Sequence, residues 1–314
     1  MPVDPISLQV FKSKFESVAE EMGVALQRTA YSPNIKERRD FSCAVFNPEG
    51  DMVAQAADIP VHLGAMPASV KAALTVFPDS LNPGDIVMLN DPYMGGSHLP
   101  DITMVAPIYS EEKGKKVLTG FVANRGHHAD VGGMTPGSLP LSTELYQEGI
   151  IIPPIKLARR GRLNQEIIQL ICRNSRTSDE RKGDLAAQTA AIKVGEQRMK
   201  EVTERYGLAE TLEHMAALLD YTERITRQAI AKIPDGRYEV TDYMDDDGLT
   251  QELVPITVAI TVSGEELYID FTGTSPQRPG CINAPVAVTT SACLYVVRCL
   301  LDEQTPANQG CLRP

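Results

Sequence analysis

A helical stretch separates two segments that have the pattern of β-strands, and this separation most constrains the fold. Its apolar side chains recur at steps of three and four, which predicts helices over 163–172, 179–206 and 209–233. Thr177 and Glu180 have the spacing of a capping box at the start of the second helix. Short apolar runs bounded by Gly, Pro or charged turns come before and after the stretch. We therefore predict an α+β fold, with mixed β-sheets and a central helical segment.

The first strand-rich segment begins with a helix. Asp4 can cap this helix, Pro5 suits its first turn, and its apolar side chains keep helical spacing as far as Leu26. The other elements that we predict are strands over 43–46 and 52–54 joined by a turn, a helix over 64–77, strands over 85–89, 102–108, 117–123, 237–243, 253–262 and 267–271, and a helix over 286–301.

We expect three regions: a metal-bearing α+β region over 1–160, a helical region over 161–235 and a second α+β region over 236–314. The last residues, 308–314, show neither the pattern of a polar tail nor that of a capped element. We therefore expect the last region to be truncated and the fold to be incomplete.

Acidic side chains outnumber basic ones by 41 to 30, which gives a formal net charge of −11. This excess argues against nucleic acid or an anionic membrane as the main partner. Residues 1–5 lack the basic flank of a signal peptide, and no apolar run approaches the length of a membrane helix. We expect a cytoplasmic protein that binds neither nucleic acid nor a membrane.

Histidines are concentrated in one part of the chain, where they lie beside carboxylates. Two clusters contain, in chain order, Asp91, His98, Asp101, His127, His128 and Asp130. Imidazole and carboxylate ligands together suit zinc, manganese or iron, whereas calcium and magnesium prefer oxygen alone. Both clusters follow predicted strands, where binding residues are often displayed. The sequence therefore predicts a divalent metal site.

The second cluster leaves a choice between two histidines. Neighbouring side chains of an extended strand point to opposite sides, so at most one of His127 and His128 faces the ion if the strand continues through them. The other histidine would donate a hydrogen bond to one of the metal ligands or contact the substrate. The residues alone do not decide between these roles, and both histidines stay candidates as ligands and as catalytic residues.

Further candidates each have a structural interpretation as well. Asp40 follows Arg38 and Arg39, with which it could form a surface ion pair. Asp91 stands in a turn sequence, and His62 could be a buried histidine that caps the following helix. We keep Asp40 and Asp91 as candidate metal ligands and His62, with Asp130, as a candidate catalytic residue.

A metal with an open position lowers the pKa of bound water and polarises a carbonyl or phosphoryl oxygen. Such a site predicts hydrolysis or addition at an electrophilic carbon, with a histidine or carboxylate outside the ligand set carrying protons. The chain has no nucleophile elbow, P-loop or dinucleotide fingerprint. The metal site is therefore the main indication of chemistry.

Five sequence blocks around these residues resemble the hydantoinase B/oxoprolinase family, and the resemblance covers essentially the whole chain. The blocks are Asp40–Ala44, Asp58–Gly64, Asn90–Asp101, Asn124–Gly133 and Arg181–Gln188. The longest uninterrupted match, Asn90–Asp101, is highly specific. Because the B-type subunits of this family are much longer, the resemblance implies that this chain corresponds to their N-terminal part.

The resemblance also implies a set of site residues and a partner. Its implied metal ligands are Asp40, His98, Asp101 and one of His127 and His128, with Asp91 and Asp130 as supporting carboxylates. It implies an A-type partner that binds ATP and phosphorylates the substrate, so ATP is not expected to bind to this chain. A hetero-oligomer follows from this division of labour.

Three functions remain open at this point. We expect a subunit of an ATP-dependent cyclic-amide hydrolase, in which metal-activated water attacks a phosphorylated hydantoin, 5-oxoproline or related lactam. The alternatives are a subunit of an ATP-dependent ketone carboxylase and a non-catalytic scaffold subunit. A requirement for bicarbonate would identify the carboxylase, and the absence of bound metal would favour the scaffold.

Overall fold

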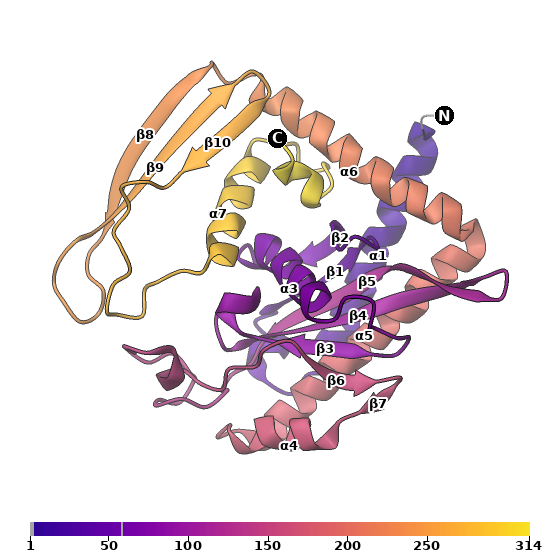
Figure 1. The fold of residues 1–314 in the computed structure, drawn as a ribbon, viewed down its shortest axis with the longest axis horizontal. Helices are drawn as coiled ribbons and strands as arrows, with labels where there is room; N and C mark the ends of the chain where they lie inside the picture. The colour runs from indigo at the N-terminus through magenta and orange to yellow at the C-terminus, as the bar shows by residue number, and fades with distance from the viewer. Residues whose placement is uncertain (1–2, 58) are drawn as a thin grey trace.

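The computed structural model describes residues 3–57 and 59–314 and confirms the predicted α+β class (Figure 1). Within these residues, one sheet has seven strands in the order β2-β1-β5-β4-β3-β6-β7, and another has three in the order β10-β9-β8. All neighbouring strands are antiparallel. The strands are β1 (Phe41–Phe46), β2 (Met52–Ala57), β3 (Ile86–Leu89), β4 (Asp101–Glu112), β5 (Lys115–His127), β6 (Ile155–Arg159), β7 (Arg162–Leu163), β8 (Gly236–Met244), β9 (Val254–Ser263) and β10 (Glu266–Asp270).

The helices include two long ones in the centre of the chain, as predicted. They are α1 (Pro5–Thr29), α2 (Pro33–Lys36), α3 (His62–Val76), α4 (Gln165–Arg173), α5 (Ser178–Tyr206), α6 (Leu208–Ile230) and α7 (Val286–Cys299), with 3-10 turns η1 (Pro92–Met94), η2 (Leu145–Gln147) and η3 (Gln309–Leu312). None of the helices in the described part of the chain is long and apolar enough to cross a membrane.

The first helix, α1, begins where its sequence predicts. The Asp4 side chain accepts a hydrogen bond from the Ser7 N–H at 2.9 Å, and Pro5 occupies a position where no N–H is needed. Its buried stripe packs on the larger sheet and on α5 and includes Phe11, Phe15, Val18, Met22 and Leu26. Burial of this stripe removes apolar surface from water and is the main stabilisation of the helix.

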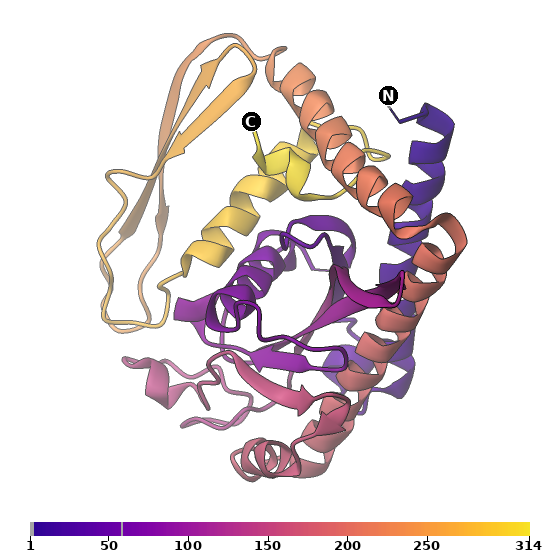
Figure 2. The same ribbon diagram turned by 45° about the vertical axis from the view of Figure 1, so that its right-hand side comes forward.

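Alternation along the strands gives the larger sheet two different apolar faces. Helices α1 and α5 cover one face of this sheet and α3 covers the other (Figures 1 and 2). Val45 and Val122 pack with α1 and α5, and Phe46 and Phe121 pack with α3. Side chains of the central helices thus share a core with the first 160 residues. The division of the chain into three regions stays a prediction.

Several predicted details differ from the structure. Leu163 was predicted to be helical but lies in β7, because Asn164 caps α4 by accepting hydrogen bonds from the N–H groups of its first turn. The predicted capping box at Thr177 is wrong, since Thr177 makes no side-chain capping bond. Strands β4 and β5 are longer than predicted, and β5 runs on to His127. Strand β6 was not predicted.

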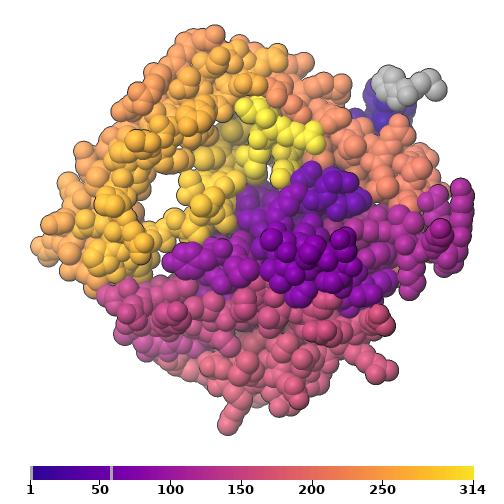
Figure 3. Space-filling model, in the orientation of Figure 1, coloured from indigo at the N-terminus to yellow at the C-terminus, as the bar shows by residue number. Residues whose placement is uncertain are grey.

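The smaller sheet stands apart from the larger one, and α7 lies between them (Figure 1). Helix α7 packs on α3, where the Gly64 N–H donates to Ser291 Oγ at 3.0 Å. A Cβ on Gly64 would lie 2.7 Å from the Ser291 nitrogen, so the two helices approach closely only because this residue is glycine. Figure 3 shows an opening that remains between the smaller sheet and α7.

Candidate metal centre

The side chains of His98, Asp101 and His127 meet at one end of β4 and β5. The strand register pairs Asp101 with His127, and the loop that leads into β4 supplies His98. The Nε2 atom of His98 lies 2.9 Å from Asp101 Oδ1, His127 Nδ1 lies 3.1 Å from the same oxygen, and the two nitrogens are 3.2 Å apart. Two imidazole nitrogens and a carboxylate oxygen that face one point fit zinc, manganese or iron.

Asp40 lies at the edge of this group, immediately before β1. Its Oδ2 is 3.9 Å from His127 Nδ1, and its carbonyl accepts a hydrogen bond from the His127 N–H at 2.9 Å. The backbone contact ties the start of β1 to the end of β5. Asp40 therefore offers a further carboxylate beside the three clustered side chains.

His127 and His128 point to opposite faces of the sheet, as expected for neighbours in an extended chain. His128 is fully buried and hydrogen-bonds through Nε2 to Gln188 Oε1 of α5 at 2.9 Å, on the face away from the cluster. Burial, together with the positive charge of Arg181, lowers the pKa of His128 to about 4. The imidazole is therefore neutral at pH 7, and the structure does not bring it to the other candidate ligands.

Asp91 and Asp130 also lie outside the cluster, where each carboxylate organises a turn. The Asp91 side chain caps η1 by accepting from the Tyr93 N–H at 2.9 Å. Asp130 accepts from the Gly132 N–H at 3.0 Å and pairs with Arg176 at 3.0 Å. These contacts correspond to the turn roles that compete with a site role for such residues.

His62, the first residue of α3, lies behind Asp101. Its Nε2 is 3.4 Å from Asp101 Oδ2, and its side chain is 1% exposed. The expected capping role is wrong, because the N-cap position of α3 belongs to Val61 and no side chain caps this helix. The structure thus places His62 in contact with the cluster and away from solvent.

Asp101 is the centre of this group of side chains. Burial alone would raise the pKa of its carboxyl, but the imidazoles of His127, His62 and His98 hold that pKa well below its usual range. For His98, burial lowers the pKa, and the Asp101 carboxylate more than offsets this so that the pKa is raised. Asp101 is therefore ionised at neutral pH, which a metal ligand requires.

Sequence reasoning missed three polar residues behind the cluster, namely Ser42, Ser97 and Arg125. All three are buried, and Ser97 donates to Asp101 Oδ2 at 2.6 Å. Each lies inside one of the sequence blocks that carry the family resemblance. Their position in those blocks could have indicated a role, although no spacing rule connects them to Asp101.

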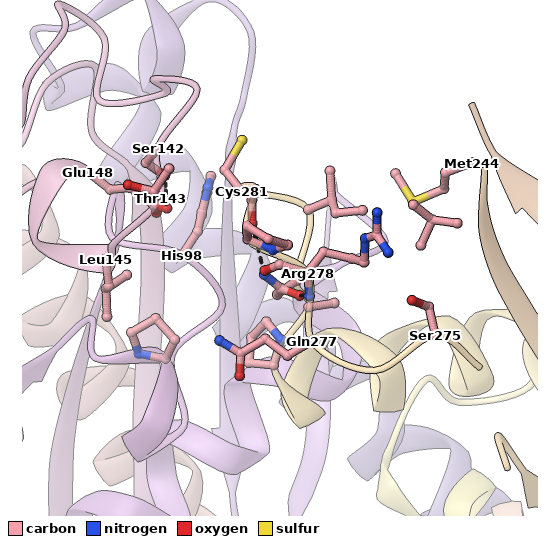
Figure 4. A pocket seen from close by; sticks show the side chains of 18 of the residues that line it. His98, Ser142, Thr143, Leu145, Glu148, Met244, Ser275, Gln277, Arg278 and Cys281 are labelled. Carbon is pink, nitrogen blue, oxygen red and sulfur yellow. Dashed lines mark hydrogen bonds between the residues drawn. The ribbon is translucent and has the colours of Figure 1, made fainter. Parts of the chain in front are cut away.

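A cavity of about 940 Å³ reaches the cluster at His98 (Figure 4). Ser142 and Thr143 line it on one side, and Gln277 and Arg278 come from the segment that precedes α7. Apolar side chains of the smaller sheet and of neighbouring segments complete the lining, among them Leu139, Leu141, Met244, Val254 and Ile256. The His98 side chain is 37% exposed, so it joins the candidate metal cluster to a space large enough for a small ligand.

Relatives match the whole chain. The 5-oxoprolinase of Saccharomyces cerevisiae is 40% identical over an alignment of 326 positions, which covers 100% of this chain and 25% of that protein. A protein from Pseudomonas sp. strain NS671, named as one subunit of a D-/L-hydantoinase, is 34% identical, and the match covers 99% of this chain and 55% of that protein. This chain therefore spans only about a quarter of one relative and about half of the other.

A solved structure is also similar. The crystal structure of ATP-dependent caprolactamase from Pseudomonas jessenii matches with a TM-score of 0.91 and 32% identity, covering 100% of this chain and 53% of that chain. The family model described as hydantoinase B/oxoprolinase matches residues 4–314. This chain therefore belongs to the hydantoinase B/oxoprolinase family, as its sequence blocks predicted.

Proposed function

We propose that this chain carries the metal centre of an enzyme that uses ATP to hydrolyse a cyclic amide, such as a hydantoin, 5-oxoproline or a related lactam. The observation that carries the proposal is the cluster of His98, Asp101 and His127, which reaches a cavity of about 940 Å³ through His98. Similarity to proteins named 5-oxoprolinase and ATP-dependent caprolactamase supports the class of reaction.

His98, Asp101 and His127 would hold a zinc, manganese or iron ion, and Asp40 is the carboxylate placed to join them. When bound, such an ion lowers the pKa of water and polarises a substrate oxygen. The chain itself contributes the ionised Asp101 carboxylate and a fixed separation of Asp101 and His127, set by the β4–β5 register. His128, Asp91 and Asp130 are assigned to the surrounding structure.

The cavity lining suits a small ring. Leu141, Met244 and Ile256 supply apolar surface that excludes water, and Ser142 and Gln277 supply polar groups that can orient an amide. His98 is the cluster residue that a substrate in this space would meet. The ring would thus lie with its amide toward His98 and its carbon skeleton toward the smaller sheet.

ATP would be used by an A-type partner, in a hetero-oligomer with this chain. Phosphorylation of a lactam oxygen converts a poor electrophile into an activated imidate with a good leaving group, which water can attack at neutral pH. The Pseudomonas sp. relative is named as one subunit of its enzyme, which supports a partner. This chain also lacks a P-loop or similar phosphate-binding motif.

The proposal is tested with the protein purified together with its A-type partner. Ring opening of 5-oxoproline, hydantoin and caprolactam is measured alongside ADP release, and metal content is measured by elemental analysis. We expect near-stoichiometric metal and coupled ring opening, with a loss of about 10³-fold or more in His98→Ala. His214→Ala, at a buried histidine of α6, is the control and should retain activity.

Three results would redirect the proposal. Ring opening that is unchanged in His98→Ala would remove this cluster from the reaction. Consumption of bicarbonate with a ketone, in place of ring opening, would identify a carboxylase. A preparation without zinc, manganese or iron, and without activity after these metals are added, would leave the scaffold function.

A further inference from the structure

The two oxygens of the Asp101 carboxylate have different neighbours. Oδ1 lies 2.9 Å from His98 Nε2 and 3.1 Å from His127 Nδ1. Oδ2 lies 2.6 Å from Ser97 Oγ and 3.4 Å from His62 Nε2. One oxygen therefore faces the candidate ligands, and the other faces the interior of the protein.

On the inner side, Ser97 is held by a buried arginine. Because the Ser97 hydroxyl donates to Asp101, its oxygen is left to accept from Arg125 Nη1 at 3.3 Å. Among the described residues, Arg125 bonds otherwise to hydroxyl and carbonyl oxygens, including Thr103 Oγ1 and Ser69 Oγ, each at 2.8 Å. The Ser97 hydroxyl thus bridges the Arg125 guanidinium and the Asp101 carboxylate.

His62 is held in the same way by a second serine. A carboxylate only accepts hydrogen bonds, so the proton of His62 that faces Asp101 is on Nε2. The other ring nitrogen, Nδ1, lies 2.9 Å from the Ser42 hydroxyl oxygen, which is hydrogen-bond distance. Ser42 and His62 are both buried, and neither lines the 940 Å³ cavity, so substrate contact does not account for this arrangement.

We propose that Asp101 binds the ion through Oδ1 and accepts hydrogen bonds from the protein through Oδ2. Ser97 and His62 are then positioning residues that hold the carboxylate in this orientation. The inference rests on the metal site of the proposed function. A metal ligand is oriented by the hydrogen bonds that it makes on the side away from the ion. The loss of these bonds typically weakens metal binding by about 10- to 100-fold. Arg125 and Ser42 act one step further back, since they orient Ser97 and His62.

The test measures binding of Zn²⁺ and Mn²⁺ to the full-length protein by calorimetry, and the visible absorption spectrum of the Co²⁺ form. We expect Ser97→Ala and His62→Ala to bind each metal about 10- to 100-fold more weakly and to shift the Co²⁺ spectrum. Ser97→Thr keeps the hydroxyl and should restore binding. If Ser97→Ala does not fold, Ser97→Cys replaces it, because a thiol of similar volume is a weak donor.

A matched control separates positioning from general stability. His214 is 4% exposed and lies 2.7 Å from the Glu210 carbonyl and 3.1 Å from Ser7 Oγ, so His214→Ala also removes a buried, hydrogen-bonded imidazole. We expect it to lower the melting temperature and leave metal affinity unchanged. Unchanged affinity in Ser97→Ala and His62→Ala, with binding abolished in Asp101→Asn, would overturn the inference and leave the metal site standing. Absence of metal binding in the unmodified protein would instead overturn the proposed function.

Discussion

The two sheets of this chain are stabilised in different ways. Helices cover both faces of the seven-stranded sheet, and β1 is buried along its whole length. In the three-stranded sheet, every side chain of β8 is exposed. The candidate metal ligands belong to the first sheet and its loops, whereas the second sheet supplies one wall of the cavity.

This difference separates two requirements of a catalytic site. Ligands must be held to within a fraction of an ångström, and close packing on rigid strands provides that accuracy. The part of the smaller sheet that lines the cavity needs only a shape and polarity that suit the substrate. We infer that the seven-stranded sheet fixes the chemistry and that the three-stranded sheet shapes the space beside it.

The largest predicted effect tests the packing contrast directly. Phe46, the last residue of β1, is fully buried against α3, and replacing it by Ala removes a large apolar side chain and leaves a cavity. We expect Phe46→Ala to lower the free energy of unfolding by about 3–5 kcal/mol. Val240 of β8 is 59% exposed, and Val240→Ala should lower the free energy of unfolding by less than about 1 kcal/mol. Urea unfolding followed by circular dichroism measures both.

Equal losses of stability in the two variants would contradict the difference between the two sheets. They would mean that the apolar residues of β8 are covered in solution, for example by another chain. A loss in Phe46→Ala alone would confirm that stability resides in the larger sheet. Two separate unfolding transitions would show that the sheets unfold independently, and each would then need its own free energy.

Periodicity predicted the elements of both sheets but not the contacts between them. The spacing of apolar residues indicated α1, the two long central helices and most strands, because burial of one face is a local pattern. The pairing of Asp101 with His127 depends on the register of β4 and β5, which no local pattern specifies. The prediction that His98, Asp101 and one of His127 and His128 share a metal site therefore came from the family resemblance and not from any local pattern.

The choice between His127 and His128 shows the same limit. Alternation along a strand predicted that the two imidazoles face opposite sides, but not which side holds Asp101. Ser97 and Arg125 were not predicted at all, because they reach Asp101 only after β4, β5 and the 90–100 loop have folded together. Sequence patterns describe faces, whereas hydrogen-bond networks depend on the assembled structure.

An intermediate effect is expected where the two regions join. A Cβ at position 64 would lie 2.7 Å from the backbone nitrogen of Ser291. Gly64→Ala should therefore push α7 away from α3 and lower the free energy of unfolding by about 1–3 kcal/mol. Thermal unfolding measures the change, with Thr75→Ala on the exposed side of α3 as the control. A neutral Gly64→Ala would show that α7 can shift without loss, and that the cavity wall it supports is more adaptable than its packing indicates.

The smallest effect concerns the turn beyond β8, where order depends on polar contacts. Asp247 is buried and accepts from the N–H groups of Thr250 at 2.7 Å and Leu249 at 3.0 Å, and Arg278 lies 3.3 Å away. The backbone N–H groups of Thr250 and Leu249, with help from Arg278, lower the pKa of Asp247 to about 2. The ionised carboxylate therefore stabilises the folded turn relative to the unfolded chain.

The sign of the pH dependence follows from this depressed pKa. The pKa of an Asp carboxyl is about 3.9 in the unfolded chain, and that of Asp247 is lower in the folded protein. The carboxyl therefore contributes its full stabilisation of the fold above about pH 4, and this contribution disappears as the pH falls from about 4 toward 2. We expect the unmodified protein to melt at a higher temperature than Asp247→Asn at pH 6, and this difference to shrink by pH 3. Asp245→Asn, at an exposed carboxylate of the same turn, should show a smaller difference at pH 6. If the Asp247→Asn difference stayed constant with pH, the turn would be held by shape alone, and the three-stranded sheet would resemble the larger sheet more closely than its exposure indicates.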